Sequence, residues 1–80
     1  MLVPLFGFLQ GDTIGLVVLV QDDQTVGDIA AILQEAASIR VPPRDRVSVY
    51  FHGERLDPDR TVASVGFAPL DRVDVVPEVT

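Results

Sequence analysis

Two apolar runs without interruption dominate the first quarter of the chain. They are Leu5-Phe6-Gly7-Phe8-Leu9 and Leu16-Val17-Val18-Leu19-Val20. Successive side chains of a strand point to opposite faces of a sheet, so a strand with one face in water should alternate apolar with polar residues. Neither run alternates. We therefore expect both strands to carry apolar side chains on both faces of their sheet.

Only residues 26–37 have the apolar spacing of an amphipathic helix. Apolar side chains recur there every three or four positions, which predicts an inward stripe of Val26, Ile29, Ala30, Leu33 and Ala37. The same spacing lets three further positions broaden the apolar face: Ala31, Ile32 and Ala36. It turns three polar residues toward solvent: Asp28, Gln34 and Glu35. Thr25, with an acidic residue three positions later, is an expected N-cap with a capping box.

The remaining pattern predicts a small sheet and one helical turn. Strands are expected at residues 2–9, 14–20, 46–51 and 72–76, with a very short one at residues 55–56. Thr61 and Gly66 would begin and end the helical turn. A hairpin, a crossing helix and further strands are typical of a two-layer α+β domain, here a single domain over residues 1–80. A right-handed crossover would place the last strand parallel to the first.

One helix covers one face of such a sheet, so the other face should remain apolar. If the first hairpin has an even-numbered loop, Gln10 pairs with Thr13, and Leu9 and Ile14 share a face. The side facing the helix then holds Val3, Leu5, Leu9, Ile14, Leu16, Val18, Val20, Val47, Val49, Val73 and Val75. The opposite side holds Phe6, Phe8, Val17, Leu19, Ser48, Tyr50 and Val76. An odd-numbered loop would exchange the two sets in the first strand.

The uncovered side is the strongest candidate for a functional surface. Large exposed apolar patches usually mark a partner surface, and aromatic side chains are enriched at interface centres. The candidate interface residues are Phe6, Phe8, Val17, Leu19, Tyr50 and Val76. The alternatives are that the first strand frays at its terminus, or that these are ordinary exposed apolar residues.

Composition narrows the classes of partner. The formal net charge is −6. Hydrophobic residues make up 48% of the chain, and this high content argues against a disordered chain. Acidic chains do not suit nucleic acid or anionic membranes. The chain has no cysteine, which fits a reducing cytoplasm and gives neither disulfides nor a thiolate metal site. Pro4 and Gly7 interrupt the N-terminal apolar stretch, so we expect neither a signal peptide nor a membrane span.

No residues form a convincing active site. His52 and Glu54 could supply two metal ligands, but a metal site normally needs three or four, and both lie in an expected surface turn. Asp57 and Asp59 could act as a carboxylate pair, but they flank a proline in an expected loop. We expect no catalytic, cofactor-binding or metal-binding residue in this chain.

The layout resembles the ubiquitin-like β-grasp. The second half of the chain carries this resemblance, at spacings like those of ubiquitin, through Pro42-Pro43, Val49-Tyr50-Phe51, Gly53, Leu56, Asp59, Arg60, Thr61 and Val62. The chain ends Pro77-Glu78-Val79-Thr80 and has no terminal Gly-Gly. It therefore does not resemble a conjugated modifier.

A closer resemblance is to the small γ (B-type) subunit of the toluene-monooxygenase hydroxylases, which are soluble diiron enzymes. It covers nearly the whole chain and is carried by Pro4-Leu5, Asp12, Val18, Val20, Thr25-Val26, Ile29-Ala30, Leu56, Pro58, Gly66, Pro69 and Val73-Asp74-Val75-Val76. The chain departs from the family in two places. The segment 57–60 is more acidic, and the basic character near the third strand is reduced to Arg44 and Arg46.

That resemblance implies a role. Such γ subunits belong to hydroxylases that act on aromatic or alkene hydrocarbons and contain large, small and γ chains, with the diiron centre in the large chain. The chain would then be a non-catalytic accessory subunit without a cofactor of its own, docked on the large and small hydroxylase subunits. The alternative is a free-standing ubiquitin-like adaptor or secretion-associated module that binds a transient partner through the same face.

Overall fold

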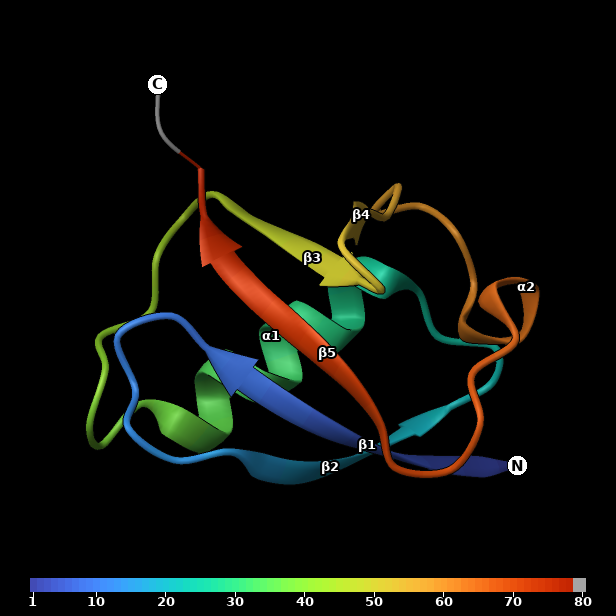
Figure 1. The fold of residues 1–80 in the computed structure, drawn as a ribbon, viewed down its shortest axis with the longest axis horizontal. Coiled ribbons are helices and arrows are strands. Elements are labelled where there is room, and N and C mark those ends of the chain that lie inside the picture. Colours follow the sequence, from blue (N-terminus) through green and yellow to red (C-terminus); the bar gives the residue numbers. More distant parts are fainter. Residues whose placement is uncertain (79–80) are drawn as a thin grey trace.

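The computed structural model describes residues 1–78. It contains a five-stranded mixed sheet crossed on one face by a single long helix (Figure 1). The elements are β1 (Leu2–Leu9), β2 (Leu16–Gln21), α1 (Val26–Ala37), β3 (Val47–Phe51), β4 (Glu54–Arg55), α2 (Val62–Val65) and β5 (Asp71–Pro77). The predicted α+β class, the crossing helix and the short helical turn are confirmed.

The strand order is β2-β1-β5-β3-β4. The last long strand, β5, runs parallel to β1, with Leu5 opposite Asp71 and Leu9 opposite Val75. The predicted parallel placement of the last strand beside the first is therefore confirmed. Strand β3 pairs antiparallel with the other edge of β5. The first and last strands in sequence, β1 and β5, are therefore neighbours inside the sheet.

The first hairpin has the parity of an even-numbered loop. Leu5 lies opposite Val18 and Gly7 opposite Leu16. The prediction for Ile14 is wrong, because β2 begins only at Leu16 and the Ile14 side chain is 46% exposed. The loop turns at Gly11, whose φ is +98°. The next residue, Asp12, is bound to Arg40. Because of this turn and this contact, Ile14 lies in the loop and outside the paired strands.

Helix α1 begins as its sequence predicts. The Thr25 hydroxyl oxygen accepts a hydrogen bond from the Asp28 N–H, and the Asp28 carboxylate accepts one from the Thr25 N–H. The whole predicted inward stripe is buried, whereas Ala31 and Ala36 are exposed.

The expectation that Gln34 faces solvent is wrong, since this residue is buried. Its side-chain amide accepts a 2.7 Å hydrogen bond from the Arg44 N–H and donates a 3.3 Å hydrogen bond to the Arg44 carbonyl. Both polar groups of the amide are therefore satisfied by the connection between α1 and β3, which lets a polar side chain lie under that connection at low cost.

The core lies between α1 and the sheet face it crosses. Its fully buried large side chains are Leu5, Ile29, Leu33, Val20, Val26, Val62, Val73 and Val75. Leu33 of the helix packs directly over Gly7 of β1, where an added Cβ would lie 2.9 Å from both Leu33 methyl groups. Glycine at this position thus sets how close the two layers come.

Candidate partner interface

The sheet face opposite α1, here called the open face, is turned toward the viewer in Figure 1. Strand registers decide which side chains share it. Phe6 is paired with Val17 across β1 and β2, and Ser48 with Val76 across β3 and β5. Since side chains alternate along each strand, the open face carries all the predicted interface residues: Phe6, Phe8, Val17, Leu19, Tyr50 and Val76.

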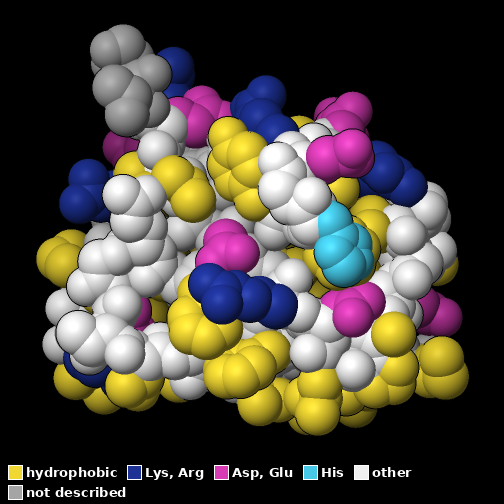
Figure 2. Space-filling model, in the orientation of Figure 1, with side chains coloured by type: hydrophobic (Ala, Val, Ile, Leu, Met, Phe, Trp, Pro, Cys, Tyr) yellow, Lys and Arg dark blue, Asp and Glu magenta, His cyan; other side chains and the backbone are white. Residues whose placement is uncertain are grey.

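Exposure is uneven across this face. Val17 is 60% exposed, Leu19 56% and Phe6 38%, whereas Phe8, Tyr50 and Val76 are half-buried. Leu2, which is not among the predicted interface residues, is also exposed on this face. Apolar surface is therefore concentrated over β1 and β2, and Figure 2 shows it as a band along the lower edge of the molecule.

Two aromatic rings of β1 pack together on the open face. The Phe6 and Phe8 rings pack with their centroids 4.8 Å apart. They lie against the backbone at Gly15, where an added Cβ would come within 2.8 Å of the Phe8 ring and would also collide with Phe6. Gly15 therefore gives the rings the space in which they pack.

A charged pair crosses the open face next to these rings. The Arg72 guanidinium lies 4.0 Å from the Phe8 ring centroid, and its Nη2 donates a 3.0 Å hydrogen bond to the Asp74 carboxylate. A cation over an aromatic face is attracted to it. Neither residue is among the interface residues predicted from the sequence, although the alternation of Arg72, Asp74 and Val76 along β5 indicates this face.

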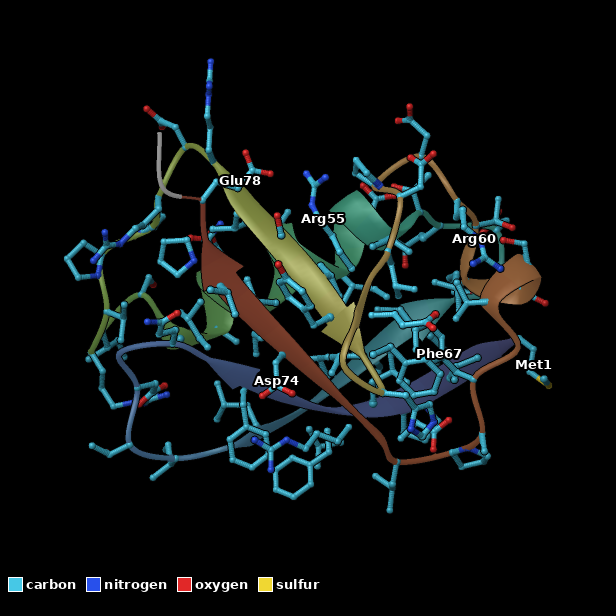
Figure 3. The ribbon with its side chains drawn as sticks, turned by 45° about the horizontal axis from the view of Figure 1, so that its top comes forward. Met1, Arg55, Arg60, Phe67, Asp74 and Glu78 are labelled. Atoms are coloured by element: carbon cyan, nitrogen blue, oxygen red, sulfur yellow. The ribbon has the colours of Figure 1, made fainter. Side chains whose placement is uncertain are left out.

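A second polar group covers the end of β3 and β5. Ser48 donates a 2.9 Å hydrogen bond to the Glu78 carboxylate, and Arg55 donates one to each of these residues. The hydrogen bond from Ser48 is the largest cause that holds the pKa of Glu78 below its usual value, and the hydrogen bond that Arg55 donates to Glu78 is the next. Ser48 is consequently buried beside a shallow groove, and Figure 3 shows Arg55 and Glu78 together at this end of the sheet.

Four charged side chains of the open face form two ion pairs, Arg72 with Asp74 and Arg55 with Glu78. Arg46 also lies close enough to Glu78 to favour its charged form. A partly apolar face whose acidic groups are paired costs less to desolvate than one with unpaired charges. This arrangement suits a protein interface better than a catalytic centre.

The other candidate residues do not come together as a site. His52 is exposed in a turn at φ +53° and stacks on Phe51, with a centroid separation of 4.0 Å. The Asp57 carboxylate accepts the Asp59 N–H at 2.9 Å and so shapes its own loop. Within residues 1–78 no group of three or more His, Asp or Glu side chains is placed to hold a metal ion. None of the helices in that range is long and apolar enough to cross a membrane.

Comparisons with known proteins identify a family and a fold. Residues 2–76 match the family model described as toluene-4-monooxygenase system protein B (TmoB). A chain in a structure of the toluene 4-monooxygenase HD complex with the inhibitor 4-bromobenzoate is 26% identical, with a TM-score of 0.89 and coverage of 98% of this chain and 100% of that chain. Curated protein sequences gave no match.

Two ubiquitin-like structures show the fold alone. Ubiquitin of Caldiarchaeum subterraneum is 18% identical, with a TM-score of 0.77 and coverage of 100% of this chain and 98% of that one. The ubiquitin-like domain of Dsk2 from Plasmodium falciparum is 22% identical, with a TM-score of 0.78 and coverage of 98% and 100%. The predicted ubiquitin-like β-grasp is confirmed.

Proposed function

Because the chain belongs to the toluene-4-monooxygenase system protein B family, we propose that it is the small accessory subunit of a multicomponent hydrocarbon monooxygenase. In this proposal it docks on the large, diiron-bearing hydroxylase subunit, in an assembly that also contains the small hydroxylase subunit. The substrate class is an aromatic or alkene hydrocarbon, and the site of action is the cytoplasm.

The observation that carries the proposal is the extent of the match. The family model covers residues 2–76, and the chain from the toluene 4-monooxygenase complex is covered over its whole length. A ubiquitin-like fold alone would not distinguish this role from that of an adaptor, because one fold serves many functions. The family match favours the accessory role.

The open face supplies the means of docking. If a partner covers ~400 Å² of its apolar surface, the burial contributes about 10 kcal/mol at ~25 cal/mol per Å². Association and side-chain ordering offset a large share of this. The exposed apolar side chains Leu2, Phe6, Val17 and Leu19 lie together over β1 and β2, so this half of the face would form the centre of the contact.

The proposal assigns no catalytic residue and no cofactor to this chain. The iron of such an enzyme would be held by the large subunit. The chain would act by supporting the large subunit in its folded, assembled form, and its absence should lower the yield of intact hydroxylase without changing the iron ligands.

Co-purification with the cognate large and small hydroxylase subunits tests the proposal. A Leu19→Asp variant places a charge in the exposed apolar area and should lose the complex while staying folded. Ile39→Asp is the matched control, because Ile39 is 92% exposed but lies after α1, away from the open face. This control should bind as the parent chain does.

Two results would contradict the proposal. A folded chain that never co-purifies with the hydroxylase subunits would remove the accessory role. Weak, rapidly reversible binding of about micromolar Kd to some other protein would instead favour the adaptor, since a permanent subunit contact is tighter.

A further inference from the structure

Strand β2 forms one edge of the sheet. It pairs with β1 alone, so its other edge has no strand partner among residues 1–78. Unpaired strand edges present rows of N–H and C=O groups that can pair with another extended chain. Whether this edge is open to such pairing depends on which residues point outward.

The hydrogen bonds around β2 give the answer. The Asp22 N–H donates to the Met1 carbonyl at 3.2 Å, and because backbone groups alternate along an antiparallel strand, even-numbered residues of β2 face β1. Odd-numbered residues therefore face outward. Gln21 agrees: its N–H donates to the Gln24 side chain at 2.8 Å, and its carbonyl accepts the Gln24 N–H at 3.1 Å.

Two residues are left with free outward groups. The Gln21–Gln24 contacts close one end of the edge, so Val17 and Leu19 present the remaining N–H and C=O pairs. Their side chains are also exposed, at 60% and 56%, on the open face. A strand paired here would satisfy the backbone groups, and its own side chains on the open face would lie beside those of Val17 and Leu19.

The sequence of β2 does nothing to prevent such pairing. From Leu16 to Val20 it contains no charge and no proline, whereas natural edge strands are usually protected by one or the other. The opposite edge differs, since β4 consists only of Glu54 and Arg55. A strand from a partner would therefore pair more readily with β2 than with β4.

We propose that an extended, uncharged segment of the hydroxylase partner pairs with β2 and continues the sheet, bonding to the backbone of Val17 and Leu19. The inference rests on the proposed function and names the contact that would accompany docking of the open face. A second copy of this chain is a poorer occupant, because each copy carries a net charge of −6 and like charges oppose association.

Amide hydrogen exchange of the parent chain, free and in complex with its cognate hydroxylase subunits, tests the inference. In the free chain the Val17 and Leu19 amides should exchange rapidly. In the complex both should slow by about tenfold or more, as hydrogen-bonded amides do. The Val18 and Val20 amides face β1 and serve as internal controls that are protected in both states.

A proline variant provides a second, independent measurement. Leu19→Pro removes the leucine side chain together with the outward N–H and breaks no hydrogen bond to β1, a change that edge strands accept. Leu19→Ala also removes most of the side chain but keeps this N–H, so the difference between the two variants reports on the N–H. We expect Leu19→Pro to bind the hydroxylase about tenfold more weakly than Leu19→Ala. Thermal unfolding of both variants shows that they are folded.

The outcomes separate the two proposals. If Leu19→Asp abolishes the complex but the Val17 and Leu19 amides stay unprotected and Leu19→Pro binds like Leu19→Ala, docking stands and strand addition is wrong. If no complex forms with the parent chain, both are wrong. If the free chain sediments as a dimer with both amides protected, the occupant is a second copy and the partner strand is ruled out.

Discussion

Arg40 binds the Asp12 carboxylate with two nitrogens, Nε to Oδ1 and Nη2 to Oδ2, each at 2.9 Å. The Thr13 N–H donates to the same carboxylate at 2.8 Å, and the Asp12 side chain is only 2% exposed. Asp12 lies in the loop between β1 and β2, whereas Arg40 follows α1. The pair therefore fastens the hairpin loop to the end of the helix.

This pair should make stability depend on pH. The hydrogen bond from Arg40 is the main cause that holds the pKa of Asp12 below its ordinary value of 3.8. A carboxylate whose pKa is lower in the folded state stabilises the fold above its unfolded pKa, and this contribution is lost as the pH falls through the folded-state pKa. We expect the free energy of unfolding to fall with acidification below about pH 4.

Asp12→Asn identifies the source of that dependence. The free energy of unfolding, measured by urea denaturation from neutral pH to pH 2, should fall less steeply in the variant than in the parent chain. Glu78, whose pKa is also lowered, should supply a remaining dependence of the same sign. A parent and variant with parallel pH profiles would show that Asp12 is not coupled to Arg40 in solution.

Gly7→Ala should destabilise the fold through Leu33. The added methyl group would lie 2.9 Å from both Leu33 Cδ atoms, and overpacking of this kind typically costs about 1–3 kcal/mol. In a Leu33→Ala background, itself expected to cost about 2–5 kcal/mol, the same change should cost much less. A double-mutant cycle by urea denaturation measures the coupling, and additive effects would contradict direct contact.

Gln34→Ala should cost about 1–2 kcal/mol, because the Arg44 N–H and C=O lose their partners beneath the connection that follows α1. Glu35→Ala, one position along the helix at an exposed site, is the control and should be nearly neutral. Urea denaturation distinguishes the two. Equal effects would mean that solvent replaces the Gln34 amide without cost.

Gly15→Ala should alter the open face more than the core. The new methyl group would collide with the Phe6 and Phe8 rings, which must then move away from the backbone. We expect weaker binding to the hydroxylase, by about tenfold, with a loss of stability near the lower end of the roughly 1–3 kcal/mol that overpacking costs, because the exposed Phe6 ring can shift. Gly27→Ala, where the added Cβ meets nothing closer than 3.4 Å, should bind as the parent chain does.

The parts of the fold predicted from sequence are those with local signals. Both ends of β1 and of α1 agree with the predicted ranges 2–9 and 26–37, because Thr25 caps the helix and Pro42-Pro43 prevents its continuation. The other strands differ from their predicted ranges by one or two residues at one or both ends. The hairpin parity, left open by the sequence, is settled by the pairing of Gly7 with Leu16.

The errors arose where distant residues decide the outcome. Ile14 was expected in the core, but Asp12 is held by Arg40, 28 positions away, and no local pattern shows this. Gln34 reads as a solvent position until its pairing with the backbone of Arg44 is known. The Arg72–Asp74 pair was different: alternation within β5 contained the signal.

The central pairing of β1 with β5 also governs when the molecule can form. A ribosome delivers β1 well before β5, yet β5 lies between β1 and β3 in the sheet. Until synthesis has passed Pro77, the hairpin and β3 have no strand to join them, and the growing chain exposes its apolar segments. This domain should therefore fold only after β5 has been synthesised, at the slower pace of domains whose strand pairings are distant in sequence.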